Sequence, residues 1–159
     1  MNYRNLSKED FDAIVTGELT HYAIWMENVL VDIISKQFCQ PARRVDFERL
    51  LLRRDGLTFQ DKIEIVRAML PQFSNQPAAQ KFKHLLTKVE DFKANRNAFA
   101  HGTDVTPTIN PGGGICVEIV TRSGKEKVVS VTPESHQTTI KEAETLLKEL
   151  HTLRNELCT

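Results

Sequence analysis

The stretch that decides the fold is residues 77–102, PAAQKFKHLLTKVEDFKANRNAFAHG. Its apolar residues recur at intervals of three and four, a spacing typical of an amphipathic helix. Pro77 suits the first turn of a helix, and Gly102 suits the position just past a helix end. The stretch therefore predicts a long helix that ends near His101-Gly102. Its apolar stripe consists of Phe82, Leu85, Leu86, Val89, Phe92 and Phe99.

Helical patterns also lie on both sides of this stretch. Ser7 and Asp10 form a capping box for a long first helix that extends to about Cys39. Thr132 as a cap, followed by Pro133 in the first turn, begins a last helix with apolar residues on one side. We therefore expect three long helices. The first of them and the helix of residues 77–102 carry more apolar surface than one four-helix core needs, which favours a two-fold homodimer.

A shorter helix and a β-hairpin complete the expected fold. Thr58 with Asp61 begins the shorter helix, which Pro71 stops. Residues 115–122 and 126–131 alternate apolar and polar residues, and Ser123-Gly124 joins them in a hairpin turn. The segment before them, 103–114, is rich in Thr, Pro and Gly and predicts a loop. We expect a mainly α fold, a four-helix up-and-down bundle with a β-hairpin of about residues 115–131 inserted before the last helix.

Length and composition exclude several classes of protein. A chain of 159 residues is about the size of one domain, so residues 1–159 are expected to fold as a single helical domain. Its 21 basic and 21 acidic residues cancel, and 40% apolar residues do not suit a disordered or polybasic protein. The sequence has no apolar run long enough for a membrane span and no signal-peptide core. We expect a soluble, cytoplasmic protein with no membrane partner.

Known catalytic and metal-binding signatures are absent from the sequence. It contains no HExxH, no Gly-rich phosphate loop and no GxSxG. Cys39, Cys116 and Cys158 lie far apart, which suggests neither a zinc knuckle nor a disulfide framework. No cofactor or metal is predicted. His21, His84, His136 and His151 show no ligand spacing and are expected to be surface or packing residues.

Residues 43–54, RRVDFERLLLRR, follow Pro41 and predict a short helix. This basic segment has a net charge of +3, because it contains five arginines and two acidic residues. Such charge runs are most often solvated helix faces. The other interpretation is contact with an RNA backbone, in which Arg43 and Arg44 would bind phosphates.

Arg96 departs from the apolar pattern of its helix. At about 100° per residue, Arg96 lies within the stripe of Val89, Phe92 and Phe99 rather than opposite it. A guanidinium stays charged, so it is costly to bury without a partner. Arg96 is therefore either half of a structural ion pair, with Glu18 of the first helix as a possible partner, or part of an anion-binding site.

His101 lies five residues after Arg96, or about 140° around an ideal helix, so one regular helix cannot present both on one face. Taken alone, a histidine at a helix end is most often a cap or a dipole partner. The two residues could meet if the helix frays before Gly102, or if two copies of the chain meet across a two-fold axis. Asn97 and His101, four residues apart, share a face.

At Arg96-Asn97-Ala98-Phe99-Ala100-His101 the chain resembles the HEPN (higher eukaryotes and prokaryotes nucleotide-binding) family. The family motif is an arginine, then usually a polar residue, and a histidine after four to six intervening residues. Arg96, Asn97 and His101 match it with four residues between the arginine and the histidine. The helix start at Thr58 is also similar to a stretch frequent in the family, whereas the hairpin is a departure from many members.

The resemblance implies a metal-independent endoribonuclease of a toxin–antitoxin or antiviral defence system. It implies a homodimer whose two motifs line one cleft, and a possible antitoxin or nucleotidyltransferase partner protein. Arg96, His101 and Asn97 would be the catalytic residues, and Lys88 and Lys93 would draw RNA toward the cleft. The alternative is a non-catalytic helical module that holds a nucleotide or a partner protein.

Overall fold

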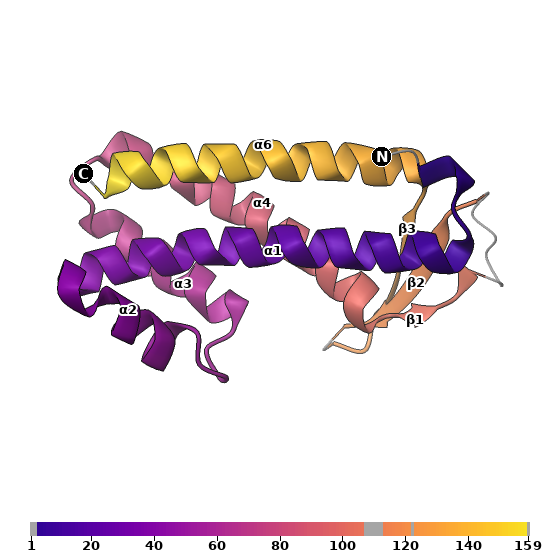
Figure 1. Cartoon of the computed structure of the whole chain (residues 1–159), viewed down its shortest axis with the longest axis horizontal. Coiled ribbons are helices and arrows are strands. Elements are labelled where there is room, and N and C mark those ends of the chain that lie inside the picture. Colours follow the sequence, from indigo (N-terminus) through magenta and orange to yellow (C-terminus); the bar gives the residue numbers. More distant parts are fainter. Residues whose placement is uncertain (1–2, 107–112, 122, 159) are drawn as a thin grey trace. The chain divides into compact units, whose positions relative to one another are not determined.

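The computed structural model describes residues 3–106, 113–121 and 123–158, and these are mainly helical (Figure 1). No helix in these ranges is both long and apolar enough to cross a membrane. The principal helices are α1 (Lys8–Phe38), α3 (Phe59–Met69), α4 (Gln76–His101) and α6 (Pro133–Leu157).

Short polar side chains fix where the helices begin. The capping box of α3 is complete, because Thr58 accepts the Asp61 N–H and Asp61 accepts the Thr58 N–H. Helix α4 begins one residue before Pro77, and the Asn75 side chain accepts the Ala78 N–H at 3.2 Å. These local contacts explain why the helices expected from the sequence form close to their predicted bounds.

The basic segment does not form the single helix expected from the sequence. A 3₁₀ turn (Pro41–Arg43) leads into the short helix α2 (Arg44–Phe47), and a π-helical turn (Glu48–Leu52) follows. A second 3₁₀ turn, Leu70–Gln72, contains the proline that was expected to stop α3. Proline is tolerated there because the first turn of a 3₁₀ or α-helix needs no N–H from it.

The predicted hairpin is present and belongs to a three-stranded antiparallel sheet. Strands β2 (Ile115–Val120) and β3 (Glu126–Val131) pair with Ile115 opposite Val131 and Val120 opposite Glu126. The segment expected to be a loop also contributes a short strand, β1 (Thr103–Asp104), which pairs with β2. Parts of the predicted loop and of the first predicted strand, residues 107–112 and 122, lie outside the described residues.

The chain divides into two compact units, and α1, α4 and α6 each contribute residues to both. The first unit comprises residues 1–23 and 91–144, and the second comprises residues 24–90 and 145–159. The first has a core of Phe11, Val15, Leu19, Phe92, Phe99, Ile115, Cys116, Val117, Val131 and Ala143. The second has a core of Met26, Leu30, Ile33, Ile34, Leu52, Ile63, Val66, Phe82, Leu86 and Leu150.

The mainly helical fold with a hairpin before the last helix is therefore confirmed. The up-and-down bundle of HEPN type and the single domain over residues 1–159 stay predictions.

Candidate functional site

Arg96, Asn97 and His101 lie on the last turns of α4, in the first unit. Helix α4 stays regular to its end, since the Gly102 N–H donates to the Ala98 carbonyl at 2.7 Å. The fraying that could have brought Arg96 and His101 together is therefore not found. By helical geometry the two residues remain about 140° apart on one chain.

The Arg96 side chain is half-buried and lacks an ion-pair partner among the described residues. Its Nε is buried and makes no hydrogen bond, although the residue is partly exposed. A buried donor without a partner costs about 1–3 kcal/mol and calls for an explanation. The ion pair with Glu18, one of the two interpretations of Arg96, is not formed.

Glu18, whose side chain is 31% exposed, is instead the centre of a cluster with the buried residues Tyr3 and His136 in the same unit. Its carboxylate lies 2.7 Å from the His136 Nε2 and accepts a hydrogen bond from the Tyr3 hydroxyl at 3.1 Å. The fully buried His136 ring packs edge-on against the rings of Tyr3 and Phe11. Burial, with a further contribution from Glu18, raises the pKa of Tyr3 from 10.0 to about 12.

From the sequence, His136 was expected to be a surface or packing residue, and the structure shows the buried role. A signal for this was present, because His136 precedes Ile140 by four residues and Ala143 by seven, on the apolar face of α6. The sequence could not indicate its partner, because Glu18 lies 118 residues away. Because Glu18 is bound to His136 and Tyr3, it does not neutralise Arg96. The Arg96 guanidinium can therefore bind an anion from outside the described residues.

Lys93 extends the surface around the motif. It precedes Arg96 by three residues and Asn97 by four, so it is a helix-surface neighbour of both. Lys93, Asn97 and His101 recur at intervals of four, and the last two are exposed. The end of α4 thus presents two cationic side chains, an amide and an imidazole to solvent, a set that can bind an anion and transfer a proton.

The small sheet holds this helix end in place. A Cβ added at Gly102 would lie 2.4 Å from the Ala98 carbonyl oxygen and 3.0 Å from the Val117 Cβ. Immediately afterwards Thr103 pairs with Glu118, so the chain passes from the motif directly into β1. The residue after His101 therefore has to be a glycine, because a side chain would overlap the last turn of α4 and press against β2. This gives the hairpin a structural role beside the motif.

The other residues predicted to bind RNA belong to the second unit. Lys88 and Arg43 are exposed, and Arg44 is half-buried with its Nε donating to the Cys39 carbonyl at 3.4 Å. Lys93 is the one predicted RNA-binding residue that lies in the first unit together with Arg96, Asn97 and His101. No interaction joins Lys88, Arg43 and Arg44 to one another among the described residues.

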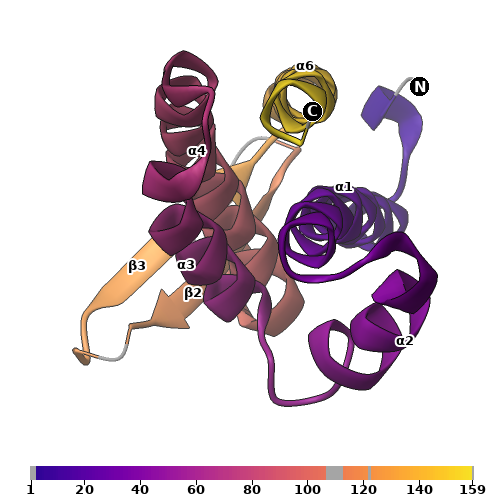
Figure 2. The same ribbon diagram turned by 90° about the vertical axis from the view of Figure 1, so that its left-hand side faces the viewer.

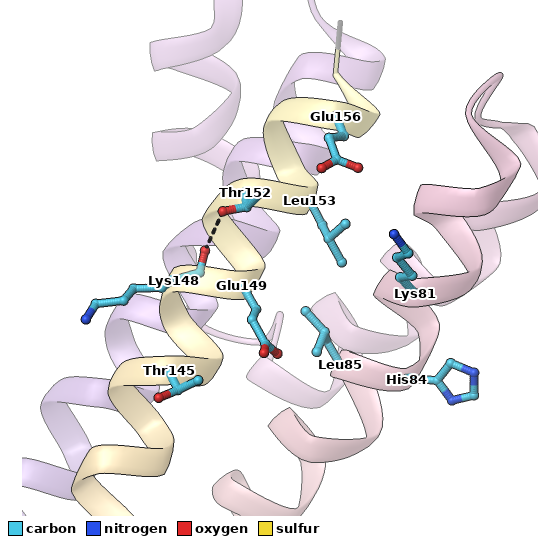
Figure 3. A pocket seen from close by; sticks show the side chains of 9 residues that line it. All are labelled: Lys81, His84, Leu85, Thr145, Lys148, Glu149, Thr152, Leu153 and Glu156. Carbon is cyan, nitrogen blue, oxygen red and sulfur yellow. Dashed lines mark hydrogen bonds between the residues drawn. The ribbon is translucent and has the colours of Figure 1, made fainter.

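A groove of about 570 Å³ in the second unit contains none of the predicted site residues (Figure 3). It lies between α4 and α6, and Leu85 and Leu153 face each other across it. Lys81, Glu149 and Glu156 provide charges of both signs along its sides. Mixed charge of this kind does not favour a phosphate chain.

Metal-ligating side chains do not gather in groups of three or more anywhere in the described ranges, and the three cysteines are free. Comparisons of the chain with family models, curated proteins and solved structures find no match. The resemblance to the HEPN family therefore rests on the sequence pattern at Arg96, Asn97 and His101.

Proposed function

We propose that the protein is a metal-independent endoribonuclease of the HEPN type, acting as a toxin or in antiviral defence. One observation carries the proposal: Arg96 is half-buried with an unpaired Nε, while Glu18, its possible internal partner, is bound by His136 and Tyr3. A structural ion pair would have explained Arg96 without any ligand. An anionic ligand such as an RNA phosphate supplies the missing partner.

The chemistry needs few groups because RNA carries its own nucleophile. The 2′-hydroxyl loses its proton and attacks the adjacent phosphorus, and the 5′-oxygen of the next nucleotide leaves with a proton. His101 would move these protons, because an imidazole can both accept and donate a proton. Arg96 would bind a non-bridging oxygen as negative charge builds on the phosphorane, and Asn97 would hold the phosphate or orient His101.

A homodimer completes the proposed site. Arg96 and His101 diverge on one regular helix, so the arginine of one chain would act beside the histidine of the other. Apolar surface on α1 supports association, since Ile24 and Trp25 are 46% and 47% exposed. The structure describes all of α4, and the large apolar side chains of this helix are buried. The surplus of exposed apolar surface that was expected on α4 is therefore absent.

The same divergence favours a second candidate function. A non-catalytic module needs only Arg96, Lys93 and Asn97 on one helix surface to hold a nucleotide phosphate or an acidic group of a partner protein. In that case His101 would contribute nothing beyond a favourable charge at the C-terminal end of the helix.

Cleavage of RNA by single-residue variants distinguishes the two functions. We expect His101→Ala to lower cleavage by about a hundredfold or more, and Asn97→Ala to lower it less. His84→Ala is the matched control, because His84 is an exposed histidine on the same helix. Cleavage should continue in excess EDTA, leave 2′,3′-cyclic phosphate ends and fail on RNA methylated at the 2′-oxygen.

Equal cleavage by a folded His101→Ala protein would refute the enzymatic proposal. Nucleotide binding that depends on Arg96 but not on His101, without cleavage, would support the non-catalytic module. Sedimentation at micromolar concentration tests the dimer, and a monomer at every salt concentration would contradict the composite site.

A further inference from the structure

Residues 41–54, here called the arginine turn, expose apolar side chains to an unusual degree. Val45 is 77% exposed, Leu50 62% and Leu51 53%, whereas Leu52 is the one leucine of the turn that is buried. Phe38, at the end of α1 just before the turn, is 59% exposed. Single exposed apolar residues are normal, but four of them in one short stretch of chain favour an interaction site.

The turn is anchored so that this surface stays outward. Glu48 accepts a hydrogen bond from the Ser35 hydroxyl of α1 at 2.8 Å and meets Arg53 at 3.5 Å. Figure 2 shows α2 on the side of α1 opposite to α6. The backbone between Glu48 and Leu52 is π-helical, an irregularity found frequently at functional sites.

Charge on the arginine turn is positive and partly unneutralised. Glu48 is occupied by Ser35 and Arg53, and Asp46 contacts Arg49 at 3.6 Å. Arg43 and Arg54 are exposed and form no ion pair with any residue that the structure describes. Arginine is enriched at protein interfaces, where its fork of donors pairs with carboxylates.

We propose that the arginine turn docks a partner protein through a segment that carries both carboxylates and aliphatic side chains. The carboxylates would pair with Arg43 and Arg54, and the aliphatic residues would cover Val45, Leu50 and Leu51. This occupant is complementary to the turn in charge and in polarity. The proposal is independent of the endoribonuclease proposal, because it uses none of the motif residues.

Two other occupants fit the same residues less well. RNA recognition pairs phosphate contacts with base stacking on aromatic rings, whereas Val45, Leu50 and Leu51 are aliphatic and Phe38, just before the turn, is the single exposed phenylalanine beside them. An anionic membrane would be repelled by Asp46, which lies among the arginines and is 57% exposed. The combination of aliphatic and mixed-charge side chains is that of a protein–protein interface.

A random peptide display library selected on the full-length protein provides the test. We expect the enriched peptides to combine Asp or Glu with Leu, Ile or Val, and their affinity to fall about tenfold or more in Leu50→Ser/Leu51→Ser. Arg43→Glu/Arg54→Glu should have a similar effect. Both double variants change exposed side chains, so circular dichroism should show an unchanged fold.

Matched control substitutions lie on the hairpin. Val120→Ser/Val128→Ser removes apolar side chains that are 66% and 43% exposed, and it should leave peptide affinity unchanged. Failure to enrich acidic apolar peptides, or equal affinity for the Leu50→Ser/Leu51→Ser variant, would overturn the proposal. Single-stranded RNA or phosphatidylglycerol vesicles that bind the protein and lose affinity in the same variants, without peptide binding, would also overturn it.

Discussion

Arg67 on α3 and Arg96 on α4 are both half-buried, yet their surroundings differ. Arg67 donates to Glu90 at 2.6 Å and to Glu64 at 2.9 Å, and the hydrogen bond to Glu90 is the main cause that raises the pKa of its guanidinium. Arg96 has no such partner among the described residues, and its Nε is buried without a hydrogen bond. Burial alone therefore does not mark an arginine as functional. The two arginines differ in whether the protein itself provides a carboxylate that pairs with the guanidinium.

The largest expected effect separates the two arginines by activity. Arg96→Ala should lower RNA cleavage by about a hundredfold or more, because the phosphorane loses its charged hydrogen-bond donor. Arg67→Ala should leave cleavage unchanged, because its partners are carboxylates of the protein itself. Cleavage rates of both variants under single-turnover conditions measure the difference. An equal loss of cleavage in both variants would contradict the proposal that Arg96, and not Arg67, binds the RNA phosphate.

The second effect concerns a buried pair in the same unit as Arg67. Lys62 is buried, with its side chain 5% exposed, and its ammonium group forms a salt bridge with Glu27. Glu27→Ala would leave that charge without a partner, and we expect the free energy of unfolding to fall by about 2 kcal/mol. The value is below that of a fully buried pair because Glu27 is 26% exposed. Urea denaturation measures it, and Lys62→Met/Glu27→Leu should recover most of the loss.

A smaller loss of stability should follow the removal of Arg67 itself. Arg67→Ala takes one partner from Glu90, which also accepts from Gln60 at 3.0 Å, so the carboxylate keeps a hydrogen bond. We expect a decrease of about 1 kcal/mol in the free energy of unfolding. Arg96→Ala should cost less, because it removes no ion pair and relieves a buried unpaired donor. A larger loss in Arg96→Ala would indicate that Arg96 is structural after all.

The smallest effect concerns an exposed pair in the unit that contains Arg96. Hydrogen bonds from Lys8 and then Thr106 lower the pKa of Asp104 from 3.8 to about 2. A lowered carboxyl pKa adds stability above pH about 4, and that contribution disappears as the pH falls toward about 2. Asp104→Asn should therefore unfold slightly more easily than the native protein near neutral pH, with the difference vanishing at about pH 2. Thermal denaturation across this range measures the difference, and one that grows with acid would contradict the assignment.

Sequence reasoning predicted the parts of this protein that local signals specify. The cap at Thr58, the helix end at His101-Gly102 and the hairpin around Ser123-Gly124 each depend on neighbouring residues, so they could be identified without a structure. The two-residue strand β1 could not, because it is defined by its pairing with β2.

The candidate site was harder to predict for a related physical reason. Helical spacing and the resemblance to the HEPN family pointed to Arg96, Asn97 and His101, but the ion pair of Arg96 with Glu18, one of the two interpretations left open, is not formed. Glu18 lies on the same face of α1 as the core, and its actual partner, His136, comes from a helix more than a hundred residues away. Helical periodicity shows which residues face inward, but it does not show which inward groups meet.

Gly102 also determines how the end of α4 moves. The last turn of a helix usually opens with little free energy, and its amide protons exchange rapidly with solvent. Here the Gly102 N–H donates to the Ala98 carbonyl, and the next residue, Thr103, pairs with Glu118 of β2, so opening of this turn disturbs the pairing of β1 with β2. We therefore expect His101 to open together with the sheet, and amide exchange in its turn to be about as slow as in β2.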